Sequence, residues 1–171
     1  MAEPPEPPEP PEPRDLELEM FSQPRLLSCA RAVAGSFAQR VGFNEIECGQ
    51  ISLAVDEALC NIINHGYERR PDGRIRISIS SLGGKPGGLR IEVEDRAKQV
   101  ELDSIRSRDL DDIRPGGLGV YIIREIMDDV RYEHREGGGM RLSMVKRLAR
   151  SDDGQGGGPA STPSAQGETR Q

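Results

Sequence analysis

Apolar and polar residues follow two different spacings along this chain, and these spacings predict the order of its secondary structure. Alternation with a period of two predicts strands at 16–20, 75–79 and 89–93, and a last hairpin is predicted at 130–133 and 140–145. Apolar residues three or four positions apart predict helices at 25–41, 45–67 and 116–127. The predicted order is strand, two helices, two strands, a long connection, one helix and two strands.

Residues typical of helix ends support these boundaries. Pro24 stands where the first predicted helix begins, and Gly42 stands where it ends. Asn44 is a plausible N-cap for the second helix. Gly66 is predicted to stop that helix as a C-terminal glycine.

The strands come in hairpin pairs, so the sheet is predicted to be mostly antiparallel. Each helix has one apolar side, so the helices can cover one face of that sheet. The predicted fold class is therefore α+β, a two-layer α/β sandwich with a mostly antiparallel sheet covered on one face by three helices.

Both ends of the chain have compositions that cannot build a core. Residues 3–13 read EPPEPPEPPEP, which favours an extended polyproline segment. Residues 151–171 hold no aliphatic residue larger than alanine. We expect disordered tails at 1–14 and 150–171 around one folded domain at 15–149.

Composition excludes several classes of function. The net charge is −6, there is no Trp, and no basic patch alternates with aromatic residues, so direct binding of nucleic acid is not expected. The chain has no window of 18 apolar residues, so no membrane span is expected. It has no apolar run near its N-terminus, so no signal peptide is expected. Cys29, Cys48 and Cys60 lack C-x-x-C spacing, and two of them, in predicted helices, look like small core residues. This pattern predicts a reduced, cytoplasmic protein without a zinc site.

The stretch 51–67, ISLAVDEALCNIINHGY, separates two kinds of side chain on one helix. At about 100° per residue, Glu57, Asn61, Asn64 and His65 share one stripe, and the apolar residues share the neighbouring stripe. The polar stripe contains no Lys or Arg and is made of groups that bind metals, move protons or donate and accept hydrogen bonds. A plain solvent-facing stripe on a core helix is the alternative interpretation.

Two further stretches are expected at the same edge of the sheet. Asp95 ends a predicted strand, and the turn at 116–119, GGLG, opens a helix. A glycine-rich turn at a helix N-terminus lets the backbone approach an anion. Taken singly, each is better explained without a ligand, Asp95 as a turn cap and the glycines as an ordinary turn into a helix.

The ordered combination of Glu57-x-x-x-Asn61, Asp95 and Gly117-x-Gly119 resembles the GHKL ATPase superfamily, the fold of gyrase, the Hsp90 chaperone and histidine kinases. Within it, the chain looks most like the small anti-sigma-factor serine kinases. The matching stretches are EALCNIINHGY at 57–67, IEVEDRA at 91–97 and GGLGVYIIREIMDDV at 116–130. The resemblance covers residues 15–147.

The resemblance implies a site that binds ATP and Mg²⁺. Asn61 would coordinate Mg²⁺, Glu57 would be the general base, and Asp95 would accept a hydrogen bond from the adenine amino group. Gly117 and Gly119 would line the phosphates beneath a lid at about 96–115, with Arg106, Arg108 and Arg114 as candidate lid cations. The flanking residues assigned to the same nucleotide site are His65, Ala97, Gly116, Leu118 and Val120.

The resemblance also implies the function of a serine/threonine protein kinase that acts as an anti-sigma factor. Such a protein phosphorylates an anti-anti-sigma partner and sequesters a sigma factor, commonly as a homodimer. One departure is Ala97, because the family has glycine two residues after the adenine-binding aspartate, and an added methyl group could either crowd the adenine or be tolerated. Two alternatives therefore stay open: a non-catalytic binding module that holds a sigma factor or another regulator, and a nucleotide sensor.

Overall fold

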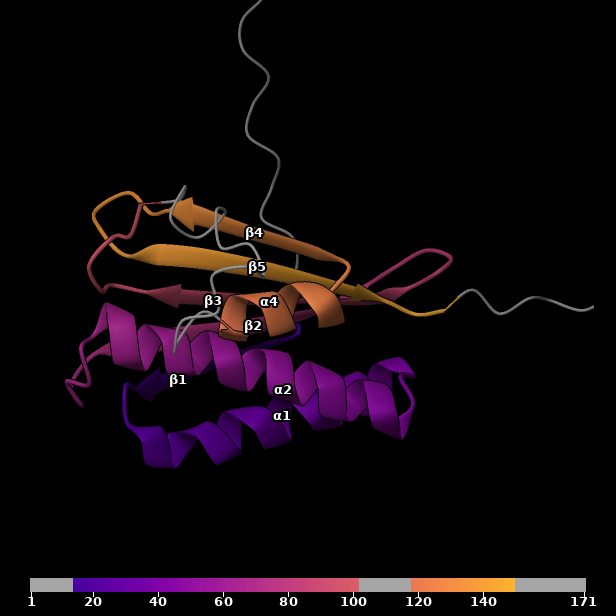
Figure 1. The fold of residues 1–171 in the computed structure, drawn as a ribbon. Coiled ribbons are helices and arrows are strands. Elements are labelled where there is room, and N and C mark those ends of the chain that lie inside the picture. Colours follow the sequence, from indigo (N-terminus) through magenta and orange to yellow (C-terminus); the bar gives the residue numbers. More distant parts are fainter. Residues whose placement is uncertain (1–13, 102–117, 150–171) are drawn as a thin grey trace, which may run out of the picture.

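The computed structural model describes residues 14–101 and 118–149, in which five antiparallel strands form one sheet with helices along one face (Figure 1). The strands are β1 (Leu16–Phe21), β2 (Arg74–Leu82), β3 (Gly88–Asp95), β4 (Asp129–His134) and β5 (Met140–Arg147). Their order across the sheet is β1-β2-β3-β5-β4. β3, which carries Asp95 at its end, is therefore the central strand.

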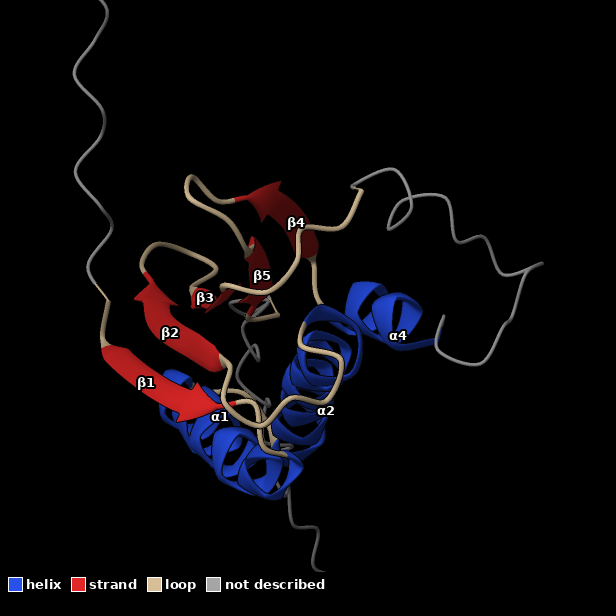
Figure 2. Cartoon of the chain, turned by 90° about the vertical axis from the view of Figure 1, so that its left-hand side faces the viewer, coloured by secondary structure: helices blue, strands red, loops and turns tan. Residues whose placement is uncertain are grey.

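The helices lie on the same side of the sheet (Figure 2). They are α1 (Leu27–Val41), which follows a 3₁₀ turn η1 (Pro24–Leu26), α2 (Glu45–Asn61), which continues into a π-helical turn η2 (Ile62–Gly66), and α4 (Leu118–Ile126). α2 packs against both α1 and α4. This arrangement confirms the predicted fold class, an α+β two-layer sandwich of an antiparallel sheet covered on one face by helices.

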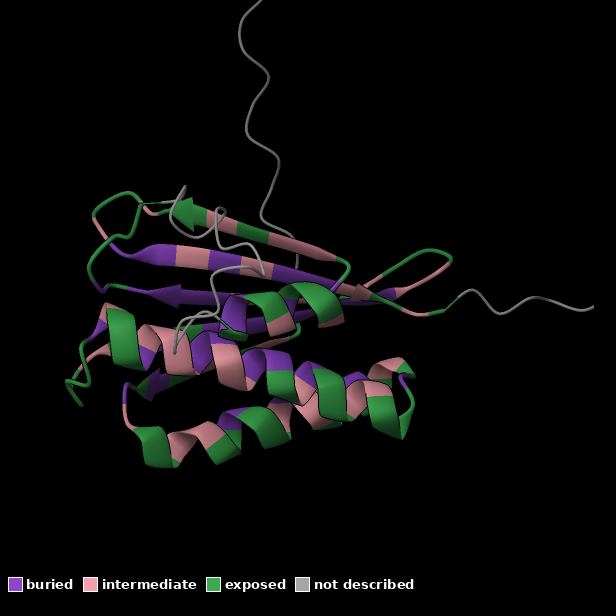
Figure 3. Cartoon of the chain, viewed as in Figure 1, coloured by how far each residue is buried: buried purple, intermediate pink, exposed green. Residues whose placement is uncertain are grey.

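The core lies between the two layers, where the buried surfaces of helices and strands face one another (Figure 3). Fully buried residues come from both layers: Ile51, Leu59 and Ile63 from α2 and η2, and Ile75, Ile79, Ile91 and Met144 from the sheet. Each such side chain contributes about 1.5–3 kcal/mol relative to an exposed position. This packing places α2 across the sheet with its apolar side in the core.

The junction between α1 and α2 forms as its sequence predicts. Gly42 adopts a left-handed conformation with φ of 115° and ends α1. The Asn44 side chain accepts a hydrogen bond from the Glu47 N–H, and the Glu47 carboxylate accepts one from the Asn44 N–H, both at 2.9 Å. This reciprocal capping box starts α2.

The end of the predicted 45–67 helix differs from the expectation. The last turn widens to a π-helix, in which the Tyr67 N–H donates to the Ile62 carbonyl five residues earlier at 2.8 Å. Gly66 is not a left-handed cap. The positive φ angles fall instead on Glu68 (51°) and Arg69 (64°). The glycine at position 66 is therefore not required for a left-handed conformation.

Two smaller features complete the picture. Glu94 alternates with the apolar residues of β3 and lies on the sheet face away from the helices, but it is only 6% exposed because Arg135 and Arg141 cover and pair with it. Among the cysteines, Cys29 is exposed, Cys60 is half-buried, and Cys48 is half-buried and packs against the core. Within the part of the chain that the structure describes, no helix is both long and apolar enough to cross a membrane.

Candidate functional site

A pocket opens where the end of α2 and η2, the middle of the sheet and the start of α4 meet. Its lining is mostly apolar, with a few polar groups. The lining residues are Ala58, Asn61, Ile62, His65, Gly66, Val93, Asp95, Lys98, Val100, Val120, Tyr132, Met140 and Leu142. An apolar slot with a few convergent polar groups suits a flat, partly polar ligand such as a purine ring.

At one end of this pocket, Gly119 touches both polar residues of α2. A Cβ atom built on Gly119 would lie 2.6 Å from Glu57 Oε2, 3.2 Å from Asn61 Nδ2 and 3.4 Å from Asn61 Oδ1. A side chain at this position would push the ends of the Glu57 and Asn61 side chains away from the first turn of α4. The structure thus brings Glu57, Asn61 and the start of α4 together, as the sequence predicts.

Asn61 has an unsatisfied polar atom in this corner. Its Nδ2 is buried and has no hydrogen-bond partner among the described residues. A buried amide nitrogen without a partner costs roughly 1–3 kcal/mol. Buried polar groups in folded proteins nearly always have a hydrogen-bond partner, so this amide nitrogen is suited to donate a hydrogen bond to a ligand.

The π-helical turn divides the polar stripe that the sequence predicts on one helix face. Asn61 and His65 line the pocket. Asn64 is exposed, and its Oδ1 accepts a hydrogen bond from Arg69 Nε at 3.1 Å. The wider turn rotates the residues after Asn61, and Asn64 belongs to the surface.

Asp95 lies at the other end of the pocket and is 4% exposed. Its Oδ1 accepts hydrogen bonds from the Ala97 N–H at 2.7 Å and from the Met140 N–H at 3.4 Å. Burial raises the pKa of the Asp95 carboxyl above its ordinary value, although these two N–H groups and the Arg135 charge partly oppose the shift. Both bonds reach Oδ1, so Oδ2 is the oxygen available to a ligand among the described residues.

Ala97 lies outside the pocket lining. It is 7% exposed, and a Cβ atom built on Gly66 would lie 2.9 Å from its Cβ. The methyl group of Ala97 therefore fills the space that Gly66 leaves open. This packing favours the alternative in which the methyl group is tolerated, because a neighbouring glycine accommodates it.

The remaining predicted residues divide between described and undescribed parts of the chain. Val120 lines the pocket, and Leu118, at the first position of α4, is 53% exposed. Gly116 and Gly117 fall outside the described residues, as do most of the predicted lid and its candidate cations Arg106, Arg108 and Arg114.

Several lining residues were not singled out from the sequence. Val93, Met140 and Leu142 are inward-facing strand positions, and their alternation identifies them as buried without showing what they border. Tyr132 belongs to the edge strand β4, and burial raises the pKa of its hydroxyl to about 12, so it stays neutral. Lys98 is exposed at the pocket rim and adds a positive charge there.

Comparison with known proteins finds the superfamily that the sequence motifs resemble. Residues 20–146 match the family described as the histidine kinase-like ATPase domain. "Serine-protein kinase RsbW" of Oceanobacillus iheyensis is 26% identical over 145 residues, which cover 80% of this chain and 89% of that protein. The protein of the same name from Bacillus subtilis is 26% identical over 141 residues, covering 78% of this chain and 85% of that protein.

Among solved structures, the histidine kinase domain of the blue-light activated histidine kinase from Erythrobacter litoralis EL346 aligns with a TM-score of 0.43. It is 18% identical, with 71% of this chain and 59% of that chain covered. The family match spans more than half of the chain. With the sandwich fold and the pocket described above, it shows that the chain belongs to the histidine kinase-like ATPase domain family.

Proposed function

We propose that this protein is an ATP-dependent serine/threonine protein kinase that acts as an anti-sigma factor. It phosphorylates an anti-anti-sigma protein on a serine or threonine and sequesters a sigma factor when that partner is phosphorylated. The relatives named serine-protein kinase RsbW, which align along most of their length, support this assignment. Assembly as a homodimer belongs to the same proposal.

One observation carries the proposal: Gly119 at the start of α4 lies against both Glu57 and Asn61, beside an apolar pocket that ends at Asp95. A nucleotide needs these parts in this order. Its base needs an apolar slot with a specific polar contact, and its phosphates need a helix N-terminus with a carboxamide nearby.

Asp95 is proposed to select adenine. Its Oδ1 is held by two main-chain N–H groups, so Oδ2 can accept a hydrogen bond from the exocyclic amino group. The 6-oxo group of guanine presents an acceptor at that position, which would face the carboxylate without a proton between them. The site should therefore bind ATP in preference to GTP.

Asn61 is proposed to hold Mg²⁺. The metal is a hard cation that takes oxygen ligands and keeps several waters, so one carboxamide oxygen together with phosphate oxygens suits it. When bound, it would neutralise charge on the transferring phosphoryl group. The unpartnered, buried Nδ2 of Asn61 would donate to a phosphate oxygen, while its Oδ1 would be the atom that holds the metal.

Glu57 is proposed to act as the general base. It lies one helical turn before Asn61 and beside Gly119, at the phosphate end of the site. In the transfer, the partner's hydroxyl oxygen forms a bond to the γ-phosphorus, and the bond from that phosphorus to the β,γ-bridging oxygen breaks. The hydroxyl proton passes to the Glu57 carboxylate, and ADP leaves with the bond electrons.

The proposal is tested by incubating the full chain with γ-labelled ATP, Mg²⁺ and a candidate anti-anti-sigma protein, followed by mass spectrometry of the partner. The expected result is one phosphate on a serine or threonine of the partner. Sigma-factor binding without ATP-analogue binding would contradict the kinase assignment and favour the binding module. ATP binding without transfer to any partner would favour the nucleotide sensor.

A further inference from the structure

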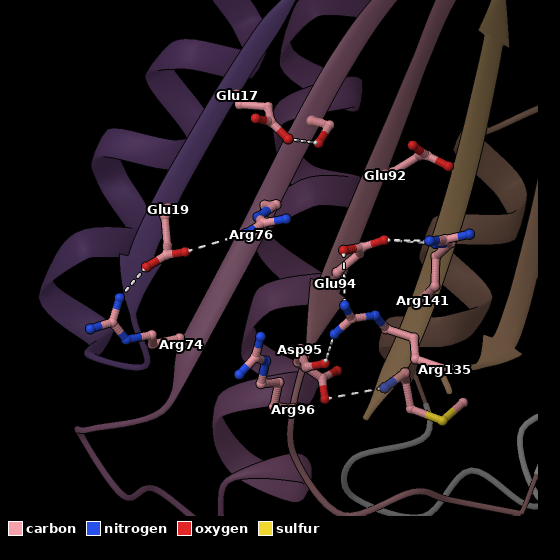
Figure 4. A network of polar contacts seen from close by, with 12 residues as sticks. Glu17, Glu19, Arg74, Arg76, Glu92, Glu94, Asp95, Arg96, Arg135 and Arg141 are labelled. Atoms are coloured by element: carbon pink, nitrogen blue, oxygen red, sulfur yellow. Dashed lines mark hydrogen bonds and ion pairs between the residues drawn. The ribbon is translucent and has the colours of Figure 1, made fainter. Parts of the chain in front are cut away.

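The turn at 135–139 between β4 and β5 packs against the end of β3, and its Arg135 side chain lies on the face of the sheet opposite the helices (Figure 4). The Arg135 guanidinium reaches across this face (Figure 4): its Nη1 donates to the Asp95 carbonyl at 2.7 Å, and its Nη2 lies 3.4 Å from Glu94 Oε2. Arg141 pairs with the other oxygen of Glu94, with Nε donating to Oε1 at 2.8 Å. Arg135 thus links a buried carboxylate to the main chain that bears Asp95.

The same turn touches the Asp95 main chain directly at Gly139. A Cβ atom on Gly139 would lie 2.1 Å from the Asp95 carbonyl oxygen and 2.7 Å from Arg96 Cα. Its φ of 86° also belongs to the left-handed region, which favours glycine. The next residue, Met140, donates its N–H to Asp95 Oδ1. The turn therefore contacts both the backbone and the carboxylate of Asp95.

The turn also holds the segment that follows Asp95. Gln99 Nε2 donates to the carbonyls of Arg135 and Gly139 at 3.1 and 3.3 Å. His134 Nε2 lies 2.9 Å from the Val100 carbonyl, with which it pairs. These contacts tie residues 95–100 to the β4–β5 turn from one end to the other.

We propose that Arg135, supported by Gly139, is a positioning residue for the adenine end of the pocket: it fixes the Asp95 main chain so that the free carboxylate oxygen faces the ligand. This inference rests on the proposed function, in which Asp95 accepts a hydrogen bond from adenine. Arg135 lies on the opposite face of the sheet from the pocket and does not line it. It acts through Asp95 and does not touch the nucleotide.

The positive charge of Arg135 also affects the pKa of Asp95, in addition to the contacts that position its main chain. Burial raises the pKa of the Asp95 carboxyl, and the Arg135 charge opposes that shift. The other ionisable groups around Asp95 are His65, Tyr67, Glu94, Arg96 and Lys98, with Glu19, Arg74 and Arg76 on the face that holds Arg135. Substitution of Arg135 also removes one ion-pair partner of Glu94, an effect for which Arg141 provides the control. Without Arg135, the pKa of Asp95 should therefore be higher than in wild type. As the pH is lowered, Asp95 should become protonated, and ATP binding should be lost, at a higher pH than in wild type.

The experiment compares Arg135→Ala with Arg141→Ala in the full chain, using a fluorescent ATP analogue between pH 5 and 8. Arg141 pairs with the other oxygen of the same Glu94 carboxylate but does not touch Asp95, so it controls for loss of the ion pair. Arg135→Ala is expected to weaken binding by about tenfold or more at pH 7 and to move the midpoint of acid loss upward. Arg141→Ala should leave affinity within about twofold and the midpoint unchanged. Arg135→Lys, which keeps the charge but not the fork of donors, should restore the midpoint and only part of the affinity.

Thermal melting without nucleotide establishes that each variant is folded before its affinity is compared. Equal affinity and an equal midpoint in Arg135→Ala and wild type would overturn the inference alone. Equal losses in Arg135→Ala and Arg141→Ala would also overturn it, because the Glu94 ion pair would then explain both. If wild type binds no ATP analogue, the proposed function fails and the inference fails with it.

Discussion

The contact between Gly66 and Ala97 makes a quantitative prediction about how the second family motif tolerates its missing glycine. Ala97→Gly removes one buried methyl group, worth about 0.8 kcal/mol, and adds backbone freedom worth about 0.4–1 kcal/mol. We expect a loss of about 1–2 kcal/mol in the free energy of unfolding. ATP affinity should stay within about threefold of wild type, because Ala97 does not line the pocket.

The reverse substitution, Gly66→Ala, places a methyl group 2.9 Å from the Ala97 Cβ. Overpacking typically costs about 1–3 kcal/mol, against a gain of about 0.4–1 kcal/mol from a stiffer unfolded chain. In the double variant Gly66→Ala/Ala97→Gly the methyl group changes sides and the clash disappears. The double variant should therefore be more stable than the sum of the single losses predicts, by at least about 1 kcal/mol.

Urea unfolding followed by far-UV circular dichroism measures these values, since the chain has no Trp for fluorescence. Gly49→Ala is the matched control, because Gly49 lies in α2 with open space around its Cβ position. That substitution should stabilise by about 0.5–1 kcal/mol in either background. Additive losses at positions 66 and 97, or an ATP affinity at least tenfold tighter in Ala97→Gly, would refute the packing argument.

Three further substitutions test the site itself. Asn61→Ala should abolish Mg²⁺-dependent binding of an ATP analogue with little change in melting temperature, because its amide nitrogen has no partner among the described residues; wild-type binding would refute the metal assignment. Gly119→Ala should weaken ATP binding by about threefold or more, because its Cβ would lie 3.2 Å from Asn61 Nδ2 and displace that amide at the phosphate end; an unchanged ATP affinity would refute this role of the close approach. Asp95→Asn should lose ATP-over-GTP preference, yet melt at or above the wild-type temperature at pH 7, because ionising the buried carboxyl opposes folding. That stability difference should vanish as the pH falls below the ordinary Asp value of 3.8, where both states of wild type are protonated.

The fold and the shared face of Glu57 and Asn61 could be predicted from the sequence because both follow from local rules. Alternation in β2 and β3 and the apolar stripe of α2 determine which faces are buried, and the capping box at Asn44 needs only neighbours three residues apart. Glu57 and Asn61 stand one turn apart in an ordinary α-helix, so their shared face was correctly derived.

The errors concern contacts between residues far apart in the chain. Gly66 looked like a helix-ending glycine, but its role depends on Ala97, 31 positions later, which no local pattern shows. Glu94 looked like a solvent-facing residue of a strand, but Arg135 and Arg141 from the last hairpin cover it. The π-helical turn that moves Asn64 to the surface is likewise invisible to a wheel drawn at a constant angle.

The central claim is that the Glu57 carboxylate acts as the general base in phosphoryl transfer. It is tested most directly by Glu57→Gln in a single-turnover reaction with saturating ATP, Mg²⁺ and the anti-anti-sigma partner. Glutamine keeps the size of the side chain but cannot accept the hydroxyl proton near neutral pH, and Asp95 and Asn61 remain. We predict near-normal ATP affinity, retained sigma-factor binding and a transfer rate lower by at least about 100-fold. A rate within a few-fold of wild type would contradict the assignment of Glu57 as the base.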